Sequence, residues 1–137
     1  MGIAFSFLPF LDACFEQRAL LSPVLALGAL KIHEPPERIA ALAGEHAYAH
    51  LARDHSVRAL LRDRYEVSAY QDCDVNGLAD LHLDLGKPLD ETWDGRFGTV
   101  LNGGTVEHVF DVRQAMTNIH RLVRPGGTMI HLAPVTW

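Results

Sequence analysis

The sequence predicts an α/β protein with a mostly parallel sheet that helices cover on both faces. Short apolar runs at 24–27, 97–101 and 129–132 are typical of buried strands. Amphipathic helical segments separate these runs, and parallel strands need such crossovers. The chain has 137 residues, enough for one domain with a single core. About five strands can be counted.

The amino-acid composition indicates a globular protein and argues against binding to nucleic acid. Hydrophobic residues make up 48% of the chain and charged residues 21%, which is ordinary for a globular protein and excludes disorder and coiled coil. Seventeen acidic residues against twelve basic ones give a net charge of −5. Because a nucleic-acid binder needs basic counter-charge for phosphates, we expect no nucleic-acid partner.

Membrane and redox signals are also absent from the sequence. Asp12, Glu16 and Arg18 interrupt the most apolar stretch, so no segment reaches the roughly 18 residues of a membrane span. The two cysteines, Cys14 and Cys73, form no CxxC motif. Neither a disulfide framework nor a cysteine zinc site is indicated, and we expect a cytoplasmic protein.

The first half of the chain begins with a predicted helical segment over residues 1–22. Apolar side chains from Phe7 to Phe15 share one helical stripe, Pro9 suits a first turn, and Ser22-Pro23 breaks the pattern. A single domain over 1–137 then continues with an α/β core at 23–137. Strand 24–27 ends at Gly28, which predicts a turn.

Two or three helices follow. Pro35 to Glu37 is typical of a helix start, with Gly44 as its stop, and a second helix starts near Glu45. The stripe loses phase at 54–56, where Ser56 is a candidate N-cap for a new helix. One bent helix and two separate helices remain alternatives.

The second half alternates strands and a helix. Strands are predicted at 66–70, 81–83, 97–101 and 129–132. The clearest helix runs from Asp111, a good N-cap, to Val123, and the turn at 124–127 ends it. Ligands of open parallel sheets bind beyond the carboxyl ends of strands. The candidate positions are therefore Gly28 onward, Gln71-Asp72, Asp84 and Asn102 to His108.

Two linked motifs carry a resemblance to a known family. Residues 97–111 read FGTVLNGGTVEHVFD, and 122–127 read LVRPGG. They resemble the fourth strand, the loop after it and the turn into strand five of class I S-adenosylmethionine-dependent methyltransferases. The resemblance spans about residues 24–134. It implies a Rossmann-like sheet of order 3-2-1-4-5, S-adenosylmethionine as cofactor, and transfer of a methyl group to an unidentified small-molecule or other acceptor.

The resemblance also implies which residues face the cofactor. After strand one the chain keeps only Gly28 of the family's glycines; Ala26 replaces the acid, and Leu30 and Ile32 stand at later glycine positions. Gln71, with Asp72 beside it, takes the place of the acid that holds ribose hydroxyls. The implied cofactor-binding residues are Gly28, Gln71, Asp72, Asp84, Leu85, Asn102 and Gly103.

Glu107 and His108 are the candidate catalytic residues. They follow a strand directly, so they are expected at the carboxyl edge near any ligand. His108 is suited to accept a proton from the methyl acceptor. The alternative for Glu107 is hydrogen bonding to its own loop amides, and for His108 packing beneath the sheet edge.

The histidines allow two interpretations, a metal site or solvated histidines on the surface. His46 and His50 lie four residues apart, which is ligand spacing on a helix, but no His-Glu-x-x-His motif supplies a site. We expect no metal. Walker A, GxGxxG and G-x-S-x-G motifs are likewise missing from the sequence.

Two further expectations concern association. The second function hypothesis is a non-catalytic, methyltransferase-like module that acts by protein association, and it predicts that Leu30 and Ile32 fill the cofactor groove. The family's C-terminal strands do not follow 129–132, so that apolar strand is predicted to be a bare edge. We therefore expect a homo-oligomer, most simply a symmetric dimer, or part of a longer chain, with Phe5 to Phe15 able to cover the face.

Overall fold

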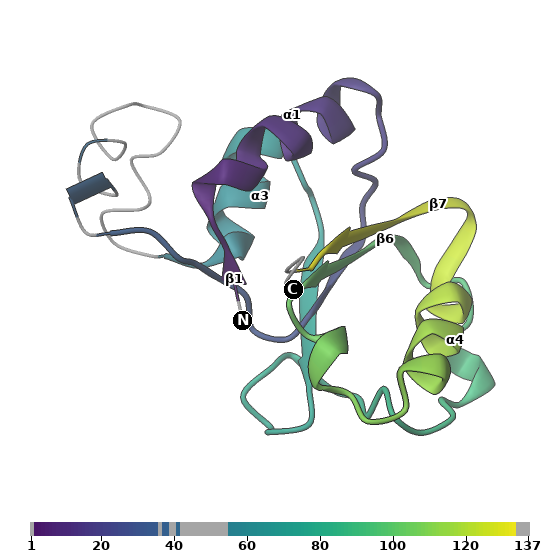
Figure 1. Cartoon of the computed structure of the whole chain (residues 1–137). Coiled ribbons are helices and arrows are strands. Elements are labelled where there is room, and N and C mark those ends of the chain that lie inside the picture. Colours follow the sequence, from purple (N-terminus) through teal and green to yellow (C-terminus); the bar gives the residue numbers. More distant parts are fainter. Residues whose placement is uncertain (1, 36, 39–40, 42–54, 134–137) are drawn as a thin grey trace.

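A five-stranded parallel sheet forms the centre of the chain, in the order β5-β4-β2-β6-β7. The computed structural model describes residues 2–35, 37–38, 41 and 55–133 (Figure 1). The strands are β2 (Val24–Leu27), β4 (Tyr70–Asp74), β5 (Leu81–His82), β6 (Phe97–Gly103) and β7 (Val123–Leu132). Counted along these five strands, the order is 3-2-1-4-5, which confirms the predicted fold class.

Helices cover both faces of this sheet. On one side lie α1 (Leu8–Glu16) and α3 (Val57–Tyr65), and on the other lies α4 (Val112–Leu122) (Figure 1). Apolar side chains of α1 and α3 share one buried cluster with Ala26 and Leu101. Side chains of α4 share another with Leu25 and Val100. Successive strand residues point to opposite faces, so the apolar strands supply both clusters.

Short 3-10 turns and a second, two-stranded sheet complete the described structure. The turns are η1 (Phe5–Phe7), η3 (Glu91–Trp93) and η4 (Val106–His108). The small sheet pairs β1 (Gly2–Ile3) with β3 (Lys31–Ile32) in parallel. It was not expected from the sequence. It fastens the N-terminus beside the segment that follows β2.

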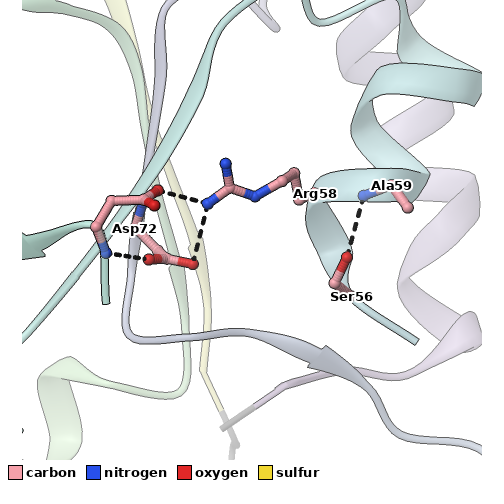
Figure 2. A network of polar contacts seen from close by, with 5 residues as sticks. Ser56, Arg58, Ala59 and Asp72 are labelled. Carbon is pink, nitrogen blue, oxygen red and sulfur yellow. Dashed lines mark hydrogen bonds and ion pairs between the residues drawn. The ribbon is translucent and has the colours of Figure 1, made fainter. Parts of the chain in front are cut away.

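The two predicted N-caps among the described residues, Ser56 and Asp111, are confirmed. Ser56 Oγ accepts a hydrogen bond from Ala59 N at 3.3 Å (Figure 2). Asp111 Oδ1 accepts one from Gln114 N at 2.8 Å. Each satisfies a first-turn amide that has no partner within its helix. The helices expected from Pro35 to Gly44 and from Glu45 lie mostly outside the described residues, as do His46 and His50.

The N-terminal helix α1 spans Leu8–Glu16, within the helical segment expected over 1–22. Two other predicted boundaries are wrong. Strand two runs over Tyr70–Asp74 rather than 66–70, because α3 extends to Tyr65 and Glu66 is its left-handed C-cap, with φ of 54°. Residues 124–127 form an irregularity within β7, where the register shifts between the pairs Phe97↔Val123 and Thr99↔Thr128.

The edge strand β7 is covered on one face from within the chain. Ile130 and Leu132 belong to the same buried cluster as Phe5 and Leu8, so the N-terminal segment covers this face as anticipated. Met129 remains 41% exposed. Among the described strands β7 pairs only with β6, so self-association through this edge stays a prediction, which light scattering would test.

The amino-terminal edge of the sheet is closed by backbone. Thr99 is fully buried, and its hydroxyl accepts a hydrogen bond from Leu21 N at 2.7 Å and donates one to Ala19 O at 3.4 Å. Gly98 N donates to Pro23 O at 2.8 Å. The segment before β2 thus lies against the start of β6, and any open site must lie at the opposite edge.

Over the described residues, no helix is long and apolar enough to cross a membrane. The same residues hold no group of three histidine, cysteine, aspartate or glutamate side chains that would bind a metal ion.

Candidate functional site

Two cavities open at the carboxyl edge of the sheet. The first has a volume of about 520 Å³ and lies between the segments that follow β4, β5 and β6. Apolar and charged side chains share its wall. Its lining residues are Cys73, Asp74, Val75, Leu83, Asp84, Leu85, Gly86, Lys87, Thr105, His108, Val109, Phe110 and Asp111.

The second cavity has a volume of about 340 Å³ and lies between the N-terminal segment, η4 and the end of β7. Its lining residues are Gly2, Phe7, His33, Gly103, Gly104, Glu107, His108, Leu132 and Ala133. His108 lines both cavities. A single side chain at the end of η4 therefore stands where the two spaces meet.

The acid at the carboxyl end of strand two is Asp74. The position predicted for it, at Gln71 with Asp72 beside it, is wrong. The register pairs Leu25 with Gln71 and Leu27 with Cys73, so Gln71 lies in mid-strand and Asp74 at its end. Gln71 is exposed and lines neither cavity. Asp74 Oδ1 accepts a hydrogen bond from Val75 N at 2.7 Å, which fixes the carboxylate at the cavity wall.

Asp72 lies outside both cavities, in a polar network that joins α3 to the sheet (Figure 2). The Arg58 guanidinium lies 3.7 Å from Asp72 Oδ2 and 2.5 Å from Asp80 Oδ2. The backbone N–H of Asp72 donates to Asp80 Oδ2 at 3.1 Å, and the backbone N–H of Asp80 donates to Asp72 Oδ1 at 2.9 Å. Arg58 stacks over the Tyr70 ring at 4.8 Å. These contacts give Asp72 a structural role at this position.

Asp84 and Leu85 line the first cavity, as expected. Asp84 Oδ1 accepts a hydrogen bond from Gly86 N at 3.0 Å, and Lys87 Nζ lies 2.9 Å from its other oxygen. Lys87 first, and then the Gly86 amide, lower the pKa of Asp84 below its ordinary value. The carboxylate is therefore ionised at neutral pH.

A buried asparagine on α4 holds the loop that carries Asp84. Asn118 is fully buried, and its amide nitrogen donates to Leu85 O at 2.8 Å and to Lys87 O at 2.7 Å. Its oxygen accepts from Gln114 Nε2 at 3.0 Å. Since a buried amide without partners would cost free energy, this network fixes the loop as well as satisfying the amide. Asn118 is an additional residue of the site that was not predicted from the sequence.

Gly28 and Asn102 support the site without lining either cavity. Gly28 forms the expected turn, with φ of 84°, and donates its N–H to Cys73 O at 2.7 Å. Asn102 is buried at the end of β6 rather than in a loop after it, and its Oδ1 accepts from Thr105 N at 2.9 Å and Val106 N at 3.2 Å. It positions the start of η4.

Gly103 and Leu30 explain how the segment after β2 packs. A Cβ on Gly103 would lie 2.9 Å from Leu30 Cδ1, so the glycine makes room for that side chain. Leu30 and Ile32 are 3% and 4% exposed and belong to the core cluster. Neither lines the first or the second cavity, whereas Gly103 lines the second. Leu30 fills the space beside Gly103 but leaves the first cavity open, so the structure gives no support to the non-catalytic hypothesis.

Glu107 and His108 lie at the carboxyl edge, as predicted from their place after β6. Both are exposed on η4, and both line the second cavity. Thr105, just before η4, donates its hydroxyl to Leu27 O and so ties this turn to the end of β2. The loop is therefore held from two neighbouring strands while its acidic and imidazole side chains face open space.

Several lining residues were missed by sequence reasoning. Asp74 would have been found had the strand boundary been set four residues later. Phe110 is completely exposed at the first cavity, and nothing in a single sequence marks such a residue. Cys73 also lines this cavity, but burial raises the pKa of its thiol to about 12, which leaves it protonated and a poor nucleophile.

The five-stranded parallel sheet with helices on both faces is a Rossmann-like fold. A family model described as a methyltransferase domain matches residues 40–131, more than half of the chain. The chain therefore belongs to the class I S-adenosylmethionine-dependent methyltransferase family. A comparison with curated proteins finds no match.

Proposed function

We propose that this chain transfers a methyl group from S-adenosylmethionine, bound in the first cavity, to a small-molecule acceptor in the second. The observation that carries the proposal is the position of His108, which lines both cavities. A donor in one cavity and an acceptor in the other would meet at this side chain. Membership of the methyltransferase family supplies the reaction class.

The first cavity fits the cofactor by size and by its donor set. Its volume of about 520 Å³ falls within the range of roughly 300–1,000 Å³ that small-molecule sites occupy. Asp74 offers carboxylate oxygens for ribose hydroxyls, the role that the family gives to the acid after strand two. Leu85, Val109 and Phe110 offer apolar surface for a flat heteroaromatic ring, with Asp84 beside them.

The residues of the chain have two tasks in this reaction. When bound, S-adenosylmethionine supplies a methyl group that is already activated on a sulfonium. The protein has to hold the acceptor close and in line, which by itself lowers the barrier strongly. His108 is placed to accept the proton that the acceptor releases, and Glu107 to orient that acceptor.

Calorimetry with S-adenosylmethionine and its demethylated product tests the cofactor site. We expect both ligands to bind the wild type, and Asp74→Asn to weaken binding about tenfold, since a hydrogen bond to a charged group contributes roughly 1.5–3 kcal/mol. Asp72→Asn is the matched control, because Asp72 lies two residues away on the same strand but outside the cavity. Absence of binding at millimolar ligand would contradict the proposal.

Turnover separates catalysis from binding. His108→Ala should reduce the rate of methyl transfer far more than it reduces cofactor affinity. Equal losses of both, or loss of folding alone, would instead support a structural role for His108.

A further inference from the structure

The second cavity differs from the first in its charge. Among the described residues, its lining includes the carboxylate of Glu107 and the imidazoles of His33 and His108, but no lysine or arginine side chain. The first cavity has Lys87 in its wall. We propose that the second cavity recognises a small amine with an apolar substituent, and that this amine is the methyl acceptor. The second half of this statement rests on the proposed function.

Glu107 is the group that selects for positive charge. Within the described residues its carboxylate has no hydrogen bond or ion pair, whereas Asp72, Asp84 and Asp94 each pair with a lysine or arginine. A carboxylate at a cavity wall that pairs with no described lysine or arginine is complementary to an ammonium ligand. An anionic acceptor would be repelled by the same side chain.

His33 is brought to the cavity by the small sheet. Its backbone N–H donates to Ile3 O at 3.0 Å, which continues the pairing of β3 with β1. A Cβ on Gly2 would overlap His33 Cδ2 and Lys31 O, so the imidazole lies directly against the Gly2 backbone. No other residue at position 2 would leave the ring in this place. The N-terminus thus sets the position of a side chain in the cavity wall.

The Glu107 carboxylate matches the hydrogen-bonding needs of a primary ammonium. Such a group has three N–H donors, and a carboxylate alone offers about four acceptor sites. Phe7 and Leu132 supply apolar surface for the substituent. The volume of about 340 Å³ lies at the small end of ligand sites, which favours a small molecule.

Methylation of this ligand requires one proton transfer. An alkyl ammonium is protonated at neutral pH, as lysine is, so its nitrogen must first give a proton to an imidazole. The freed lone pair then forms the N–C bond while the C–S bond breaks. The electron pair of that bond stays on sulfur, which changes from sulfonium to thioether, and the methylated nitrogen carries the positive charge.

Binding of three matched probes tests the recognition step without turnover. Benzylamine, benzyl alcohol and benzoate share a ring and differ in charge, and ligand-observed NMR on the full chain ranks their affinities. We expect benzylamine to bind most tightly. Glu107→Gln should weaken benzylamine about fivefold, the size expected for an exposed ion pair, and leave benzyl alcohol unchanged. Glu91→Gln, an exposed glutamate outside the cavity, is the matched control.

Gly2→Ala and His33→Gln test the contribution of the N-terminus. Both should weaken benzylamine, because a methyl group at position 2 would overlap the His33 ring and the Lys31 carbonyl and so shift this part of the cavity wall. Thermal unfolding should show that both variants remain folded. Equal binding of benzylamine and benzoate to the wild type, or no effect of Glu107→Gln, would overturn the amine site. If benzylamine is preferred but S-adenosylmethionine does not bind, the proposed function fails and the amine site stands.

Discussion

The segments that follow β2 and β6 begin side by side and end in opposite environments. The register pairs Leu27 with Asn102, so the two strands finish at the same level of the sheet. After β2 the chain turns at Gly28 into the core, where Leu30 is 3% exposed. After β6 it stays at the surface and presents Glu107 and His108 to the cavities.

This difference shows how one strand end is used for packing and its neighbour for chemistry. Family members place glycines after strand one so that the backbone approaches the cofactor. Here Leu30 and Ile32 occupy those positions and pack into the core, and β3 pairs with β1. Ligand contacts are therefore expected from the segments after β4, β5 and β6, which line the first cavity.

The largest loss of stability is expected at Leu30, in the segment that packs into the core. Leu30→Ala removes a fully buried side chain that fills the space above Gly103, so we expect a loss of about 2–5 kcal/mol in the free energy of unfolding. Urea denaturation measures this loss. Ala29→Gly, at an exposed neighbour, is the control and should cost less. A loss of less than about 1 kcal/mol for Leu30→Ala would mean that this segment is not part of the core.

The segment that follows β6 is expected to be displaced most by a substitution at Asn102. Asn102→Ala leaves the half-buried Thr105 amide and the buried Val106 amide without the Asn102 acceptor, which should cost about 1–3 kcal/mol and displace η4. We expect reduced methyl transfer with a smaller change in cofactor affinity. Asn76→Ala removes an exposed acceptor of the Leu78 amide and serves as the comparison. Unchanged stability in Asn102→Ala would show that η4 is held by other contacts.

The attachment of the N-terminal segment should depend on pH. Asp12 on α1 accepts hydrogen bonds from Arg64 at 2.9 and 3.0 Å, and from Tyr65 at 2.9 Å. Arg64 is the main cause that lowers the pKa of Asp12. This contribution is present above the ordinary aspartate pKa and is lost as pH falls through the lowered value. Because both side chains are partly exposed, it amounts to about 1 kcal/mol or less.

Unfolding of the wild type and of Asp12→Asn at neutral and acid pH checks this prediction. The difference in stability between the two proteins should be present at pH 7 and shrink near pH 3. A difference that persists unchanged in acid would show that Asp12 acts through packing rather than charge.

The smallest effect on stability is expected at Phe110. Because this side chain is completely exposed, Phe110→Ala should change the free energy of unfolding by no more than about 0.5 kcal/mol. It lines the first cavity, so affinity for S-adenosylmethionine should still fall several-fold in calorimetry. Val112→Ala, exposed on the neighbouring helix and outside the cavity lining, should change neither quantity.

Sequence reasoning predicted what periodicity specifies. The helix from Asp111 was correct, because long apolar patterns reflect burial on defined faces. The strand order was also correct, but it was implied by the family resemblance rather than by periodicity. Strand two was displaced because β4 is polar, with only Cys73 buried among its five residues. The alternation that would set its register is therefore weak, and the acid at its end was assigned to Gln71 and Asp72 instead of Asp74.

The pairing of the N-terminal strand β1 with β3 could not be predicted from local sequence patterns. β1 and β3 have two residues each and pair across 29 positions, so neither carries a strand signal of its own. The placement of His33 follows from this pairing. Asn118 was also missed, because a helical asparagine gives no sign that its amide will bind carbonyls of a distant loop.

The closed amino-terminal edge implies an uneven spread of motion. The Leu21 amide is bonded to a fully buried hydroxyl, and the Gly98 amide to Pro23 O. These protons should exchange with deuterium only through large-scale opening, on the slowest timescale of the molecule. Amides around Glu107 and His108, on a short exposed turn, should exchange far sooner. One end of each strand then serves as a stiff anchor, while the other adjusts to whatever molecule enters.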